Sequence, residues 1–299
     1  MPLNRHATAP NWRSSTVLGE WPVPLSSLPT LLALLGSALL SAWWFLSSDW
    51  RAERWRVAVR AQPFPAAWRR ILMRRVPLFR TMPADLQLLL KKQVQIFLAQ
   101  IPVIGCAGLR VTDEMRVTVA AQACLLVLHR KAGVFPNLRE VLIYPGAFVV
   151  DRVRNGGDGV LREQRQVLVG ESWQRGQVIL SWHDILEGAA IADDGRNVVL
   201  HEFAHQLDQE TGIANGAPPL PSGASERWAE VLGAEFRQLQ QRVEAGQRSL
   251  LSDYGATDPA EFFAVATEVF FERPAPLARD HAALYGELRS FYGTDPLSW

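Results

Sequence analysis

Apolar residues recur at helical spacing in the first half of the chain. Between 84 and 99 they fall at positions 86, 89, 90, 94, 96 and 97, and Pro83 suits the start of a helix. A second apolar stretch, 114–129, is also long enough for a helix. The pattern therefore predicts two consecutive helices in this part of the chain.

Short runs typical of strands follow these two helices. They cover 140–144, 148–151, 166–169 and 177–182, and glycine-containing turns at 156–159 and 174–176 interrupt them. Beyond Asp193 the pattern is helical again, apart from a loop over 212–223 that is rich in Gly, Pro, Asn and Ser. Helices, a small sheet and further helices predict an α+β chain.

The amino-terminal region differs from the rest in hydropathy and in charge. No charged residue occurs between Glu20 and Asp49, and 28–46 is a 19-residue apolar run, which is long enough to cross a bilayer. Nine arginines lie between 51 and 80, and positive residues stay on the cytoplasmic side of a membrane.

We therefore expect residues 1–63 to be an extension with a candidate inner-membrane span over 28–46 and an arginine-rich flank. A cytoplasmic domain over 64–299 would follow. The alternative is a buried or poorly ordered N-terminal extension of a soluble protein, because Pro22, Pro24, Pro29 and Gly36 weaken a helix.

The composition limits the class of protein. Hydrophobic residues make up 48% of the 299 residues and charged residues 20%, which excludes a disordered chain. The formal net charge is +1, so we expect no direct nucleic-acid binding. Cys106 and Cys124 stand in apolar surroundings and predict buried free thiols in a reducing compartment.

Residues 201–205 read His-Glu-Phe-Ala-His, a spacing with a direct chemical meaning. On a helix, His201 and His205 leave the same face about 40° apart and can bind one metal ion. Either Asp193 or Asp194 can cap the start of this helix. Zinc held by two histidines can activate a water molecule, with Glu202 as the general base.

A catalytic zinc needs a third protein ligand, and the residues leave two candidates. Asp258, Pro259 and Glu261 have the pattern of a helix start, so Glu261 is either a capping carboxylate or a metal ligand. Glu268 lies one heptad later and is the competing ligand. Asp208 either holds a ligand histidine or simply ends the helix at a loop.

Two longer segments resemble one family of proteins. Residues 201–208 (His-Glu-Phe-Ala-His-Gln-Leu-Asp) and 254–265 (Tyr-Gly-Ala-Thr-Asp-Pro-Ala-Glu-Phe-Phe-Ala-Val) resemble the Mlc titration factor A family of bacterial zinc peptidases. The likeness covers about residues 64–299. It implies an α+β, zincin-like metallopeptidase fold, similar to the catalytic domain of anthrax lethal factor, in which a small mixed sheet and surrounding helices accompany the metal-bearing helix.

The same resemblance implies the roles of the site residues. It makes His201, His205 and Glu261 the ligands of one zinc ion per chain. It makes Glu202 the general base and Tyr254 the group that stabilises the oxyanion.

The resemblance implies a zinc-dependent metallopeptidase that hydrolyses peptide or protein substrates. It also implies an aminopeptidase-like activity linked to the regulation of sugar uptake. The alternative is a regulatory binding protein that sequesters an Mlc-like transcriptional repressor, with peptidase activity secondary. The run 177–182 is either an edge strand on which a peptide substrate pairs or an interior strand.

Overall fold

The computed structural model describes residues 28–130, 134–146, 148–156, 160–168, 170–173, 176–190 and 193–299. Contacts divide the chain into two compact units, 1–55 and 56–299. The first unit contains α1 (Leu28–Leu46) and the first part of α2 (Ser48–Ala61), which continues past the boundary at residue 55. The part of the chain that the structure describes contains no helix long and apolar enough to cross a membrane, so the predicted span over 28–46 is not supported.

The second unit holds the remaining elements. They are α3 (Ala66–Arg75), α4 (Pro77–Thr81), α5 (Ala84–Gln100), β1 (Val103–Gly105), α6 (Asp113–Leu125), β2 (Glu140–Tyr144), β3 (Phe148–Gly156), β4 (Val160–Leu168), β5 (Gly170–Trp173), β6 (Gln177–Ser181), α7 (Trp182–Ala190), α8 (Val198–Asp208), η2 (Gln209–Thr211), α9 (Ser225–Glu244), η3 (Asp253–Ala256), α10 (Pro259–Glu272), α11 (Pro274–Asp280), α12 (Ala282–Tyr292) and η4 (Pro296–Ser298). The α+β prediction is confirmed, and α5 and α6 are the two predicted helices, although α6 ends four residues earlier than expected.

The main sheet has the strand order β1-β2-β6-β5. The first three strands are parallel, with Val103 opposite Val141 and Val141 opposite Val178, and β5 runs antiparallel to β6. A separate antiparallel pair is formed by β3 and β4. Because β6 lies between β2 and β5, the interior alternative for 177–182 is confirmed and the edge-strand alternative is wrong.

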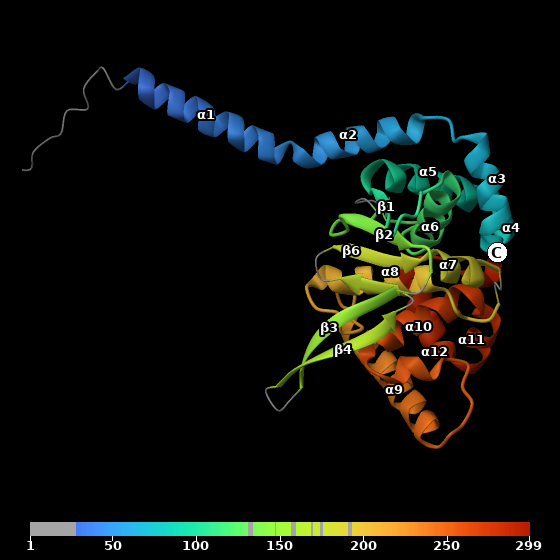
Figure 1. Ribbon diagram of the computed structural model, residues 1–299. Helices are drawn as coiled ribbons and strands as arrows, with labels where there is room; N and C mark the ends of the chain where they lie inside the picture. Colours follow the sequence, from blue (N-terminus) through green and yellow to red (C-terminus); the bar gives the residue numbers. More distant parts are fainter. Residues whose placement is uncertain are drawn as a thin grey trace, which may run out of the picture. The chain divides into compact units, whose positions relative to one another are not determined.

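Helix α8 packs against β5, β6 and α10, and Figure 1 shows α9, α10 and α12 beyond it. Its apolar side is completely covered, because Val199, Phe203 and Leu207 are at most 1% exposed. The Phe203 ring contacts the rings of Phe97 and Phe135, at centroid distances of 5.8 and 4.9 Å. Burial of this side leaves the opposite side of α8 available for the histidines.

The two cysteines are free thiols, as predicted. Cys124 on α6 is buried, and burial raises the pKa of its thiol well above the usual value. Cys106 is only partly buried, so the expectation of two buried thiols holds for one of them.

At Gly216, the loop after η2 contacts three helices, which are α8, α9 and α10. Its N–H donates to the Asp208 carboxylate at the end of α8, over 2.7 Å. Its carbonyl accepts a hydrogen bond of 2.8 Å from the Trp228 indole on α9. Gly216 has a φ of +78°, and an added Cβ would lie 2.4 Å from the carbonyl oxygen of Pro259 at the start of α10.

Gly216→Ala is therefore expected to destabilise the protein more than an equivalent change elsewhere. Gly223 is a matched control, because its φ is +81° but an added Cβ would meet nothing within 4 Å. Both variants carry the cost of a left-handed alanine, and only Gly216→Ala adds a clash. Urea denaturation should show a free energy of unfolding at least about 2 kcal/mol lower for Gly216→Ala than for Gly223→Ala. Equal values for the two variants would contradict the tight packing.

Candidate metal centre

The helix that carries the two histidines begins at Asn197. The Asn197 side-chain oxygen accepts hydrogen bonds of 3.1 Å from the backbone N–H groups of Val199 and Leu200. The prediction that Asp193 or Asp194 caps this helix is wrong, since the Asp194 carboxylate accepts instead from the N–H of Arg196. Asparagine serves as well as aspartate here, because an N-cap needs only a side-chain acceptor.

His201, His205 and Glu261 come together at one point, with all three candidate ligand atoms within 4.8 Å of one another. The Glu261 carboxylate lies 3.0 Å from His201 Nε2 and 3.3 Å from His205 Nε2. The two Nε2 atoms are themselves 3.3 Å apart. Two imidazoles and one carboxylate are a ligand set that zinc sites use, so these three residues could hold a metal ion.

Asp258 places Glu261 on the first turn of α10. The Asp258 carboxylate caps the helix by accepting from the N–H groups of Ala260 and Glu261, at 2.9 and 3.0 Å. The Glu261 side chain is thereby free to face the histidines. Burial raises the pKa of Glu261, but hydrogen bonds with His201 and His205 outweigh it and hold that pKa far below its usual range.

Glu268 occupies a different place from Glu261. Its carboxylate lies 2.7 Å from Nδ1 of His201, on the opposite side of the ring from Glu261, and also accepts from the N–H of Asn197. Burial lowers the pKa of His201, whereas the hydrogen bonds to the two glutamates raise it, with a net rise. A carboxylate on Nδ1 fixes the tautomer so that Nε2 presents its lone pair to a metal.

Tyr254 reaches the same point from η3. Its hydroxyl donates to Oε1 of Glu261 over 3.1 Å, and its ring centroid lies 5.9 Å from that of His201. Burial and the charge of Glu261 raise the pKa of Tyr254, so its phenol remains a hydrogen-bond donor at neutral pH. With 55% of its surface exposed, Tyr254 can also meet a ligand from solvent.

Glu202 is 5% exposed, and it lies near enough that its charge raises the pKa of both His201 and Tyr254. Asp208 is fully buried, and its carboxylate accepts a hydrogen bond from the backbone N–H of Gly216 in the following loop. Of the two alternatives for Asp208, this contact favours the one at the entry to the loop.

Glu272 also lies in this region, and the sequence patterns did not identify it as part of the candidate site. It is 8% exposed and accepts a hydrogen bond of 2.9 Å from the Asn197 side-chain amide. The signal that could have revealed it is a pair of carboxylates, Glu268 and Glu272, four residues apart in the apolar run of α10. A second cluster of potential metal ligands, His183, Asp184 and Glu187 on α7, is more exposed.

Comparison with known proteins places the chain in a family of metallopeptidases. A family model described as "Glucose-regulated metallo-peptidase M90" matches residues 47–293. The chain belongs to this family, and a metal is part of the family's description.

Curated relatives are similar to this chain over two thirds or more of its length. An uncharacterized protein of Synechocystis sp. is 39% identical over 83% of this chain and 90% of its own length. Proteins named Mlc titration factor A from Klebsiella pneumoniae and Escherichia coli are 38% and 33% identical, over 67% and 81% of this chain and 76% and 91% of their own lengths. The resemblance to the Mlc titration factor A family is thus confirmed.

Glu272 makes the stability of the fold depend on pH. Burial, assisted by the charge of Glu268, raises the pKa of Glu272 to about 8 against the hydrogen bond from Asn197. The pKa of Glu272 is higher in the folded state than the unfolded value of 4.5. Its contribution to the free energy of unfolding is therefore complete below pH 4.5, decreases as the pH rises, and is lost once the pH has passed about 8.

Glu272→Gln should therefore gain stability relative to wild type as the pH rises. From pH 5 to pH 8, the difference in free energy of unfolding should shift in favour of the variant by at least about 2 kcal/mol. Urea denaturation at both pH values measures it, with the exposed Glu230→Gln on α9 as control. Parallel pH curves for wild type and Glu272→Gln would contradict a protonated, buried Glu272.

Proposed function

We propose that this chain is a zinc-dependent peptidase of the zincin type. The observation that carries the proposal is the convergence of His201 Nε2, His205 Nε2 and the Glu261 carboxylate at one partly buried point. When bound there, zinc would supply a Lewis acid that lowers the pKa of a water molecule and polarises the scissile carbonyl.

Two further residues transfer the proton and stabilise the oxyanion in the proposed reaction. Glu202 takes a proton from the attacking water and later passes it to the leaving amine. Its burial and its charge interaction with His201 support this role, because they place the carboxylate inside the candidate site. The Tyr254 phenol, which is protonated at neutral pH, donates a hydrogen bond to the oxyanion that forms on the carbonyl.

Glu268 and Asn197 act as positioning residues in this account. Glu268 holds the His201 ring through Nδ1, and Asn197 ties the start of α8 to the same carboxylate. The substrates are peptides or proteins, and the aminopeptidase-like preference stays a prediction.

The mechanism separates metal binding from catalysis. Glu202→Gln should hold one zinc per chain yet hydrolyse peptides about a thousandfold more slowly, because the base is lost while the ligands remain. Glu261→Ala should lose the metal together with the activity. Metal content by atomic emission and hydrolysis of a fluorogenic peptide pool measure both quantities. Undiminished turnover in Glu202→Gln, or full zinc content in Glu261→Ala, would refute the assigned role.

A second candidate function is capture of a transcriptional repressor. The relatives named Mlc titration factor A support it, because that name describes the titration of Mlc. In this account the chain sequesters a repressor of the Mlc type and so influences sugar uptake.

Removal of the metal distinguishes the two functions. His201→Ala should abolish peptide hydrolysis because it removes a zinc ligand. If the chain is primarily a sequestering protein, the same variant should bind an Mlc-type repressor as tightly as wild type in a pull-down with purified components. Absence of binding by the wild-type chain would reject the second candidate.

A further inference from the structure

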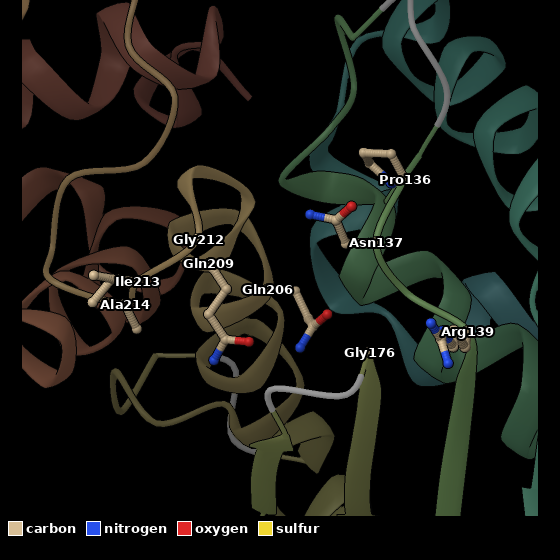
Figure 2. Close-up of a pocket in the computed structure, with 9 residues that line it drawn as sticks. All are labelled: Pro136, Asn137, Arg139, Gly176, Gln206, Gln209, Gly212, Ile213 and Ala214. Carbon is tan, nitrogen blue, oxygen red and sulfur yellow. The ribbon is translucent and has the colours of Figure 1, made fainter. Parts of the chain in front are cut away.

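A pocket of about 740 Å³ opens beside the carboxyl end of α8 (Figure 2). Its walls come from Pro136, Asn137 and Arg139 ahead of β2, from Gly176 ahead of β6, and from the loop over 212–214. Gln206 and Gln209 lie between these walls in Figure 2. None of the side chains described in this lining is acidic.

The pocket lies along the same edge of α8 as Glu202. Gln206 follows Glu202 by four residues on α8, and Gln209, which caps α8 and begins η2, follows it by seven. This spacing places all three on one edge of the helical segment. With a rise of about 1.5 Å per residue, the two glutamines lie about 6 and 10 Å further along the axis.

The proposed role of Glu202 predicts the direction in which a bound peptide runs along this edge of α8. Glu202 passes its proton to the leaving amine, so the part of the substrate that follows the scissile bond lies on the Glu202 side of the metal. An extended peptide advances about 3.3 Å per residue. A peptide that follows the edge of α8 therefore brings its second or third residue after the scissile bond to the pocket.

Arg139 gives the pocket a positive charge. The side chain is exposed, and its backbone N–H donates to the Gly176 carbonyl over 2.7 Å. Gly176 cannot easily be replaced, because its φ is +77° and an added Cβ would lie 2.3 Å from the carbonyl oxygen of Asn137. The backbone that presents Arg139 is thus fixed against β6.

We propose that this pocket is a subsite for a carboxylate located two or three residues after the scissile bond, with Arg139 as its counter-charge. A pocket lined by one arginine and three amide side chains, those of Asn137, Gln206 and Gln209, suits a carboxylate, which needs a cation and several hydrogen-bond donors. The carboxylate is either the end of a short peptide or an acidic side chain. The proposal rests on the proposed peptidase function, which supplies the direction of the substrate.

Matched peptides test the subsite with the full-length protein loaded with zinc. Each peptide is made in two lengths, with two or with three residues after the cleaved bond. The first has a free carboxyl end, the second has the same sequence with an amide end, and the third has the amide end with Asp as its last residue. Wild type should cleave at least one carboxylate peptide with a kcat/KM about tenfold higher than the amide peptide. Preference for the first peptide identifies the chain end as the ligand, and preference for the third identifies an acidic side chain.

The variant Arg139→Gln should reduce the carboxylate preference to less than about twofold. Arg110→Gln is the matched control, because Arg110 is also exposed but follows β1, at the opposite end of the parallel strands. It should retain the preference of wild type. A wild-type preference near one, or an unchanged preference in Arg139→Gln, would overturn the subsite.

Binding measurements separate failure of the subsite from failure of the proposed function. Fluorescence anisotropy of the labelled peptides reports affinity whether or not the protein cleaves them. If wild type cleaves none but binds carboxylate peptides about tenfold more tightly, and Arg139→Gln does not, the subsite stands and the peptidase function fails. Equal affinity of wild type for all three peptides overturns the subsite.

Discussion

The side chains between α8 and α10 hold the candidate metal centre together. Asn197 caps α8 and contacts two carboxylates of α10, one of which also holds the His201 ring. Buried polar groups of this kind are costly unless each finds a partner, so the two helices fit together in one register. That register brings Glu261, in the first turn of α10, to the Nε2 atoms of the two histidines.

The same contacts concentrate negative charge around two imidazoles. Glu202, Glu261, Glu268 and Glu272 are all largely buried on α8 and α10. Two features reduce the repulsion between these carboxylates. Glu272 has a pKa of about 8, so it is largely uncharged at neutral pH, and Glu261 lies 3.0 Å from His201 Nε2. A bound divalent cation would offset the remaining repulsion, which links metal binding to the stability of the fold.

Local patterns predicted the parts of the site that depend on one helix. The spacing of His201 and His205 placed both on one face, and Asp258 with Pro259 marked the start of α10 correctly. Interactions between elements were harder to predict, because sequence spacing does not show which helices meet. The cap at Asn197, the contact of Glu268 with Nδ1 of His201, the short strand β1 and the interior place of β6 all depend on tertiary packing. The spacing of one heptad between Glu261 and Glu268 left them equivalent, and only the fold assigns them to opposite sides of one ring.

We infer that one metal ion binds where α8 and α10 meet, and anomalous diffraction at the zinc absorption edge tests this inference directly. Crystals of the full-length protein grown with zinc should give a strong peak about 2.0 to 2.2 Å from His201 Nε2, His205 Nε2 and a Glu261 oxygen. Glu268 should remain on His201 Nδ1. A peak coordinated by Glu268 in place of Glu261, or a single strong peak at His183, Asp184 and Glu187 on α7, would contradict the account.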